Sequence, residues 1–141
     1  MVLSGLATLA TALFAGAALY VTLVEQPARM TCPMPIAIAE WRPSYARATI
    51  TQAALAVAGT LLGIAAGMAG EGIVWIVAGF LLSAVVPFTL IVMWPTNKRL
   101  EDASLDLSST AARGLLARWG QLHAVRTAIS LAALLLMLFA R

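Results

Sequence analysis

The hydrophobic positions of this chain gather into four long stretches, and most polar positions lie between them. The stretches are Val2–Val24, Ala46–Ala69, Ile73–Trp94 and Gln121–Ala140. A helix needs roughly 20 predominantly apolar residues to cross the hydrocarbon core of a bilayer, and each stretch reaches that length. The pattern therefore predicts an all-α, polytopic membrane protein, built as a four-transmembrane-helix bundle that forms one domain over residues 1–141.

The composition supports this interpretation and excludes several classes of protein. Hydrophobic residues make up 62% of the chain, charged residues 11%, and the mean hydropathy is +0.93, far from the values of a soluble domain. The net charge of +3 comes from basic residues that flank the stretches rather than from one patch, so we expect membrane lipid around the protein and no nucleic acid. The single cysteine, Cys32, excludes an internal disulfide and a CxxC redox pair.

The basic residues also predict an orientation. Two polar segments, 25–45 and 95–120, are interpreted as loops, and both carry Arg or Lys, whereas the short connection 67–72 carries none. Lys and Arg are enriched in the cytoplasmic loops of membrane proteins. We therefore expect both polar loops on the cytoplasmic side and both chain ends on the other side.

Small and hydroxyl-bearing residues mark one face of each of the first three stretches. On the first stretch they are Ser4, Thr8, Thr11, Ala15, Ala18 and Thr22, on the second Ala56, Gly59, Gly63 and Gly67, and on the third Gly72, Gly79 and Ser83, which share their face with Trp75. Such residues let helices approach closely within lipid, so these faces are predicted packing seams. Pro87 should kink the third helix, and the fourth should start near Ser108, Ser109 or Thr110, which can cap it.

Polar and aromatic side chains are expected at one depth, near the cytoplasmic end of the bundle. They are Glu25, Tyr45, Gln52, Trp94, Asn97, Lys98, Trp119, His123 and Arg126. Ionisable groups within a membrane are costly and usually face the bundle interior or an aqueous cavity. A purely structural alternative is an interfacial aromatic belt with an ion pair between Glu25 and Arg126. Taken together, the set favours a pocket.

Three short motifs add a resemblance to a known family. They are Glu25-Gln26-Pro27, the run Trp94-Pro95-Thr96-Asn97, and the spacing Trp119-x-x-x-His123-x-x-Arg126. In these motifs and in its four-span layout the chain resembles the anthrone-oxygenase-like family of small integral membrane proteins. The resemblance implies a four-helix membrane fold and, as in fungal polyketide-pathway members, oxidation of an anthrone to an anthraquinone without an evident cofactor. Bacterial relatives in this family favour a bacterial inner membrane for this chain.

The residues present suit that chemistry, which begins with removal of a proton from an acidic CH₂ group. We expect His123 to be the base, with Glu25 as the second candidate, because imidazole titrates near neutrality and burial raises the pKa of a carboxyl group. Arg126 and Asn97 are expected to bind the oxyanion. The expected substrate contacts are Trp94 and Trp119, which form a slot for the rings, together with Tyr45, Lys98 and Gln52.

Two other classes of function stay open at this stage. A copper- or iron-dependent oxidoreductase could use Glu25 with His123, or Cys32 with Met30 and Met34, which are soft ligands for Cu(I). No strong ligand spacing is present, so we assign no metal ligands and expect no cofactor, with O₂ as co-substrate. A non-enzymatic lipid- or quinone-binding bundle or an accessory membrane subunit is the third possibility. The sequence assigns no oligomeric state.

Overall fold

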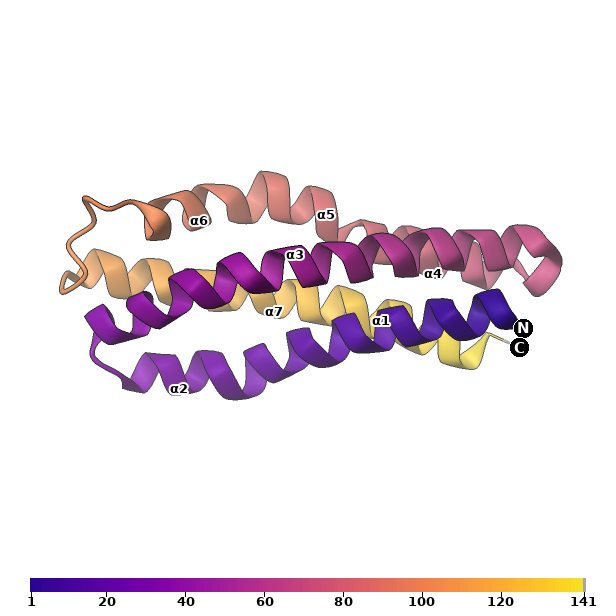
Figure 1. Cartoon of the computed structure of the whole chain (residues 1–141), viewed down its shortest axis with the longest axis horizontal. Coiled ribbons are helices and arrows are strands. Elements are labelled where there is room, and N and C mark those ends of the chain that lie inside the picture. Colours follow the sequence, from indigo (N-terminus) through magenta and orange to yellow (C-terminus); the bar gives the residue numbers. More distant parts are fainter. Residues whose placement is uncertain (141) are drawn as a thin grey trace.

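The protein is an all-helical bundle of four long, antiparallel helical segments (Figure 1). The structure, a computed structural model, describes residues 1–140. Along the chain the elements are α1 (Val2–Tyr20), η1 (Val21–Glu25), α2 (Gln26–Thr31), α3 (Met34–Ala66), η2 (Gly67–Glu71), α4 (Ile73–Ser83), α5 (Val85–Pro87), η3 (Phe88–Met93), α6 (Trp94–Glu101) and α7 (Thr110–Phe139). The predicted fold class is confirmed.

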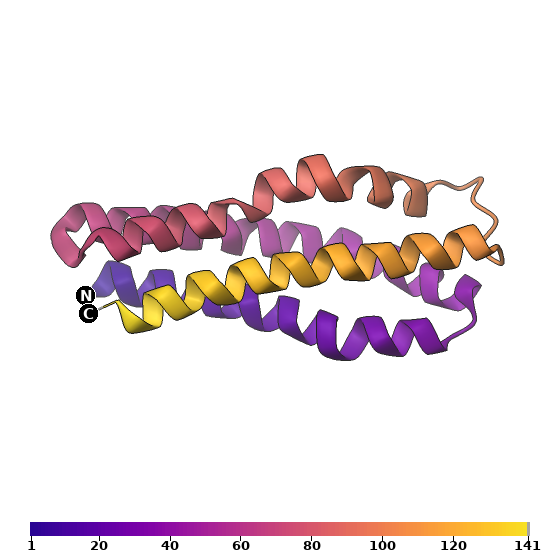
Figure 2. The same cartoon turned by 180° about the vertical axis from the view of Figure 1, so that it is seen from behind.

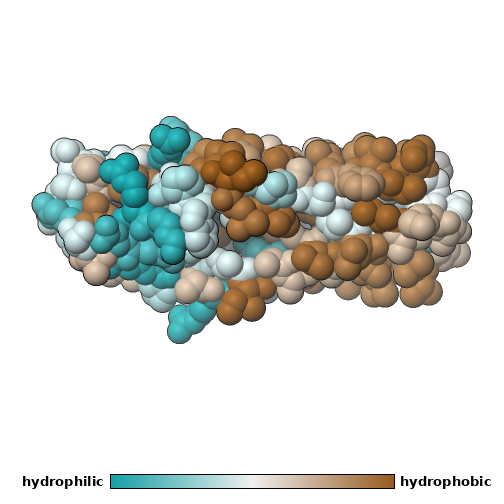
Figure 3. All heavy atoms as spheres, turned by 90° about the horizontal axis from the view of Figure 1, so that it is seen from above, coloured by the Kyte–Doolittle hydropathy of each residue, from teal (hydrophilic) through white to brown (hydrophobic). Residues whose placement is uncertain are grey.

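All four segments are long and apolar enough to cross a membrane. Their outward side chains are mostly large and hydrophobic, as Leu13, Leu61 and Phe80 illustrate, since each is more than half exposed. Figure 3 shows hydrophobic surface over most of the length of the molecule and hydrophilic surface gathered toward one end. This distribution is typical of a multi-pass membrane protein.

The two segments interpreted as polar loops are largely helical. Only Cys32 and Pro33 separate α2 from α3, and a connection over residues 102–109 separates α6 from α7. These helices continue past the apolar stretches because their inner faces form a core of their own at the polar end. Ile38 and Trp41 of α3 are fully buried there, together with Leu100 of α6 and Leu116 of α7.

Both of these connections lie at one end of the bundle, and both chain ends lie at the other (Figures 1 and 2). At the latter end, Gly70 and Gly72 adopt positive φ angles of 94° and 110°, which favour glycine and allow the sharp reversal into α4. In the connection before α7, the backbone amide and the hydroxyl of Ser104 donate to Asp102 and lower the pKa of its carboxyl group. The expected sidedness of the connections is confirmed, whereas the compartment they face stays a prediction.

Several residues of the predicted packing seams lie where two helices approach closely. Thr11, Ala15 and Ala18 of α1 are fully buried. A Cβ atom added to Gly59 would lie 2.7 Å from the hydroxyl oxygen of Thr11, and one added to Gly79 would lie 2.9 Å from the backbone oxygen of Thr60. Larger residues at these glycines would therefore push the helices apart, as expected for small-residue contacts between membrane helices.

The first and third helical segments depart from regular α-helix at three places beside prolines. The third segment changes direction between α4 and α5, just before Pro87, as predicted (Figure 2). The π-helical segments η1 and η3 lie just before Pro27 and Pro95, which have no N–H to donate and crowd the preceding turn. In η1 the N–H of Gln26 accordingly reaches back five residues, to Val21. Such bulges widen a helix and are frequent at functional sites.

The fourth helix begins where its sequence predicts. The hydroxyl oxygen of Ser109 accepts a hydrogen bond of 3.1 Å from the backbone N–H of Ala112. This is a side-chain N-cap, which satisfies one of the free amides of the first turn. From this cap α7 runs unbroken to Phe139 and carries Trp119, His123 and Arg126 on one face.

Candidate functional site

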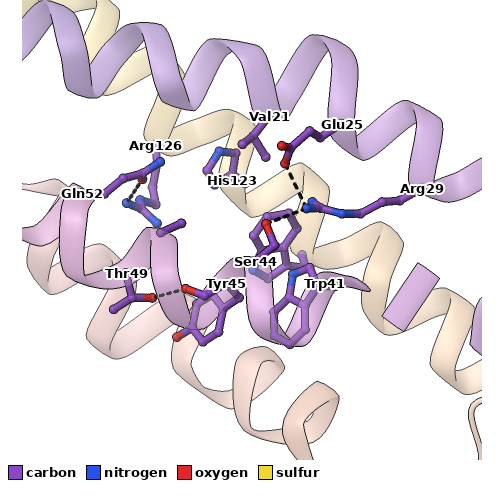
Figure 4. A pocket seen from close by; sticks show the side chains of 12 residues that line it. Val21, Glu25, Arg29, Trp41, Ser44, Tyr45, Thr49, Gln52, His123 and Arg126 are labelled. Atoms are coloured by element: carbon purple, nitrogen blue, oxygen red, sulfur yellow. Dashed lines mark hydrogen bonds and ion pairs between the residues drawn. The ribbon is translucent and has the colours of Figure 1, made fainter. Parts of the chain in front are cut away.

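A hollow lined by polar and aromatic side chains lies between the first, second and fourth helical segments, toward the polar end (Figure 4). The space free of protein atoms in it, with the open solvent at its mouth included, is about 370 Å³. We call it the histidine pocket, and its lining consists of Val21, Glu25, Arg29, Trp41, Ser44, Tyr45, Ala48, Thr49, Gln52, Trp119, His123 and Arg126. Six of the nine residues predicted for the site are in this lining.

His123 is held in one tautomer by the backbone of α1. Its Nε2 atom lies 3.3 Å from the carbonyl oxygen of Ala18. A carbonyl oxygen can only accept, so we infer that Nε2 carries the hydrogen and that Nδ1 presents a lone pair. The side chain is almost fully buried, and Nδ1 has no hydrogen-bond partner within residues 1–140. The lone pair of Nδ1 is therefore not taken up by another described group of the protein.

Arg126 lies one turn further along α7 and is only partly paired. One of its terminal nitrogens, Nη2, donates a 2.9 Å hydrogen bond to Oε1 of Gln52 on α3, and the guanidinium carbon lies 5.6 Å from the ring centroid of Phe14. The Nε atom is buried and has no partner among the described residues. Arg126 therefore combines a positive charge with an unused donor at the edge of the histidine pocket.

The ion pair that the sequence suggested between Glu25 and Arg126 is wrong. Glu25 instead accepts a 2.9 Å hydrogen bond from Arg29, one turn further along the same segment. Arg29 also pairs with Glu40 and donates to Ser44 at 3.0 Å, both from α3. Its side chain is buried despite its charge. Together these four residues form the Arg29 cluster, which joins the first two segments beside the histidine pocket.

Sequence reasoning missed Arg29 because it lies in a segment that was interpreted as a loop. In a loop, a basic residue is interpreted as a signal of membrane topology rather than as part of a binding or catalytic site. The four-residue spacing between Glu25 and Arg29 was the available signal, since this spacing places both side chains on one face of a helix. Recognising it required the helix to continue beyond the apolar stretch.

An aromatic wall lines the pocket on the side of α3 and α7. The rings of Trp41 and Tyr45 are stacked, with centroids 4.8 Å apart and an interplanar angle of 7°. Trp119 meets Trp41 edge-on at 5.7 Å and stacks on His123 at 4.9 Å. Trp41 was not among the predicted residues, although its position one turn before Tyr45 was a usable signal. The rings of Tyr45, Trp41 and Trp119 thus form a continuous row of contacts that ends at the candidate base His123.

Three predicted residues lie outside the histidine pocket. Asn97 is fully buried behind Tyr45 and donates to its hydroxyl oxygen at 3.0 Å. Trp94 and Lys98 contact one another instead, with the ammonium 4.6 Å from the ring centroid, and both side chains are exposed. The reason is the rotation of α6, which turns Asn97 and Leu100 inward. Trp94 was expected to form one wall of the pocket, and this expectation is wrong. In the structure, Trp41 lines the pocket and Trp94 does not.

Two of the metal ligands considered from the sequence, Glu25 and Cys32, make other contacts in the structure. Within residues 1–140, no three His, Cys, Asp or Glu side chains are grouped so that they could hold a metal ion. Glu25 is bound to Arg29, and the sulfur of Cys32 lies 3.6 Å from the backbone oxygen of Ala28 on its own segment.

Comparison with known proteins identifies the family. The sequence model described as anthrone oxygenase matches residues 41–136, about two thirds of the chain. The chain belongs to the anthrone oxygenase family. A curated relative, the anthrone oxygenase tpcL of Aspergillus fumigatus, is 43% identical over an alignment of 63 residues, and the match covers 41% of this chain and 38% of that protein. The chain thus spans well under half the length of this curated relative. No solved structure matches.

The family match covers part of the histidine pocket. It begins at Trp41 and includes His123 and Arg126, so the aromatic wall and the candidate base lie inside it. Glu25 and Arg29 lie before it, in the first helical segment. The matched part therefore includes the pocket residues of α3 and α7, while Val21, Glu25 and Arg29 of the first segment lie outside it.

Proposed function

We propose that this family member is a membrane-embedded oxygenase that oxidises a planar aromatic or phenolic, anthrone-like molecule with O₂ and without a metal or organic cofactor. The observation that carries the proposal is the unpaired Nδ1 atom of His123 together with the unpaired Nε atom of Arg126, on one pocket with aromatic walls. A base, a cationic donor and a surface for flat rings are the groups that this reaction needs. Membership of the family supports the oxygenase class.

The first step in this proposal is removal of a proton from carbon. The CH₂ group of an anthrone is acidic because its anion delocalises over the rings onto the ketone oxygen. Nδ1 of His123 accepts this proton, while Nε2 keeps its hydrogen bond to Ala18. The N–H groups of Arg126 stabilise the oxyanion that forms, which is how a fixed cationic donor accelerates a reaction. Trp119 and Tyr45 hold the rings.

Oxidation then follows without a further reagent. The electron-rich anion passes one electron to O₂, which gives a carbon-centred substrate radical and superoxide. These two radicals combine to form a carbon–oxygen bond and a peroxide anion. The imidazolium of His123 returns its proton to the resulting peroxide anion. Loss of the second hydrogen of the former CH₂ group as a proton, with cleavage of the O–O bond, gives a carbonyl group and water. One oxygen atom of O₂ thus enters the quinone and the other leaves in water.

Glu25 is less suited to the role of base than the sequence suggested. Oε2 of its carboxylate is already bound to the guanidinium of Arg29, whereas Nδ1 of His123 has no partner among the described residues. We therefore assign proton abstraction to His123 and give the Arg29 cluster the task of fixing the polar end of the pocket.

The test is oxygen consumption by the purified protein in proteoliposomes with 1,8-dihydroxyanthrone as the probe. We expect uptake above the protein-free autoxidation rate, with formation of the corresponding anthraquinone. Activity should persist after treatment with EDTA and with a copper(I) chelator. Activity that disappears on chelation and returns with copper or iron would favour the metal-dependent alternative. Binding of the probe without any oxygen uptake would favour a non-enzymatic binding protein.

We further propose that the end carrying the 32–33 and 102–109 connections faces the cytoplasm of a bacterial cell. The basic residues of this end support the orientation. Single cysteines introduced by Ser104→Cys and Glu71→Cys in a Cys32→Ser background provide the test. In intact spheroplasts, a membrane-impermeant maleimide should label the cysteine at position 71 and leave the one at position 104 unlabelled. The opposite result would show the inverted topology.

A further inference from the structure

A second hollow adjoins the histidine pocket and opens through the side of the bundle. It contains about 520 Å³ of space free of protein atoms. Four residues line both hollows: Tyr45, Thr49, Gln52 and Arg126. Its other lining residues are Phe14, Ala53, Ala56, Val85, Val86, Thr89 and Leu90, which are nearly all apolar. We call this space the side opening.

The kink in the third segment creates the side opening. After α4 ends at Ser83, the chain continues as α5 and η3 along a line displaced from that of α4 (Figure 1). On the opposite side, α3 presents the small residues Ala53 and Ala56. A displaced helix facing small side chains leaves space between the two backbones. Figure 3 shows a hollow on this face, with hydrophilic atoms at its floor and hydrophobic surface around it.

The surface around the side opening is largely apolar. Leu90 and Val86 in its lining are 60% and 39% exposed. On α3, Ile50 and Val57, the chain neighbours of the lining residues Thr49 and Ala56, are 76% and 51% exposed. These residues belong to segments that are apolar enough to span a membrane, and exposed hydrophobic side chains of this kind face acyl chains. By contrast, the charged Arg29 cluster occupies the polar end of the histidine pocket.

The floor of the side opening carries the polar groups that the two hollows share. Arg126 and Gln52 are bound to one another there, and Nε of Arg126 is an unused donor. A molecule that fits this space needs an apolar body for the walls and an acceptor oxygen for the guanidinium. An anthrone-like ketone has both features, and such a molecule partitions into lipid before it meets the protein.

We propose that the aromatic substrate reaches His123 laterally from the bilayer, through the side opening between α3 and η3, and that Arg126 receives its oxygen on the way in. This inference rests on the proposed function for the identity of the substrate. The side opening is then the entrance of the active site, and the residues on its two walls set the rate at which substrate enters without taking part in the chemistry.

The test narrows the opening from each wall with a bulky residue. Ala53→Phe acts from α3 and Leu90→Trp acts from η3. Their matched controls are Ala54→Phe and Ile91→Trp, which make the same changes at exposed neighbouring positions outside both hollows. The probe is 1,8-dihydroxyanthraquinone, which does not react with O₂, and its association with the protein in nanodiscs is followed by quenching of tryptophan fluorescence. Both wall variants should slow association by about tenfold or more, and neither control should.

A second measurement separates entry from chemistry. Protein loaded with 1,8-dihydroxyanthrone under anaerobic conditions is mixed with oxygenated buffer, and the single-turnover rate should be equal in the wall variants and the controls. Association as fast in both wall variants as in their controls would overturn the lateral entrance while leaving the oxygenase proposal intact. Loss of a bound phospholipid from the wall variants, with unchanged association, would show that the opening holds an acyl chain and would also overturn it. Absence of turnover in the unaltered protein would remove the proposed reaction, while the association rates would still report on the entrance.

Discussion

Replacing His123 by glutamine should lower turnover by about 10²–10⁴-fold, the range for loss of a general base. Glutamine is chosen because its amide nitrogen can still donate to the carbonyl oxygen of Ala18, as Nε2 of His123 does. Its side chain offers no nitrogen lone pair that could accept a proton. The change therefore removes the base and keeps the hydrogen bond. Oxygen uptake and anthraquinone formation with 1,8-dihydroxyanthrone measure the effect.

The control for this variant is Gln121→Ala, on an exposed position of the same helix. It should retain full turnover. Thermal unfolding in detergent, followed by circular dichroism, should give similar midpoints for the His123→Gln variant, the control and the unaltered protein. If His123→Gln turned over at the original rate, His123 would have no part in proton transfer, and the assignment of the base would have to move to another group of the pocket.

Replacing Arg126 by methionine should lower kcat by about 10²–10³-fold, the effect of losing one donor to a developing oxyanion. Methionine has a similar length and no charge, so the packing against Phe14 is largely kept. Arg126→Lys should give an intermediate value, because lysine restores the charge but not the fixed fork of donors. The measurement is steady-state kinetics in proteoliposomes, in which kcat and KM are determined separately.

Arg47→Met is the matched control, since Arg47 is exposed on α3 and lies outside the histidine pocket. It should leave both kinetic constants unchanged. The double variant His123→Gln, Arg126→Met should lose far less than the product of the two single effects, because both side chains serve the same deprotonation step. A higher KM with unchanged kcat in Arg126→Met would contradict the assigned role and would mean that Arg126 only binds the substrate.

Much of the α7 face that lines the histidine pocket could be predicted from the sequence. The spacing of Trp119, His123 and Arg126 places them along one side of a helix, and the structure has them on the lining of one pocket. The capping residue Ser109 and the kink before Pro87 are equally local features. Each depends on hydrogen bonds or steric contacts within a few residues of chain, so the sequence carries the whole cause.

The opposite wall of the pocket could not be predicted in the same way. Trp41 and Arg29 line it, whereas Trp94 and Lys98 do not. Whether Trp41 of α3 or Trp94 of α6 faces the pocket depends on how far each of these helices is rotated about its axis. The π-helical segments η1 and η3 change this rotation just before α2 and α6. A pattern of hydropathy does not report such a change of register, especially in polar segments.

The sequence by itself determined the number of membrane-spanning segments, the seams along which they pack and the face of α7 that carries the candidate base. The physical reason is that bilayer thickness and helix period act on any stretch of chain separately. Only the tertiary structure decided that Glu25 pairs with Arg29, that Arg126 pairs with Gln52, and that a second hollow beside η3 shares lining residues with the histidine pocket. These outcomes depend on which atoms of different helices come within hydrogen-bonding distance, and that is settled only when all four segments pack together.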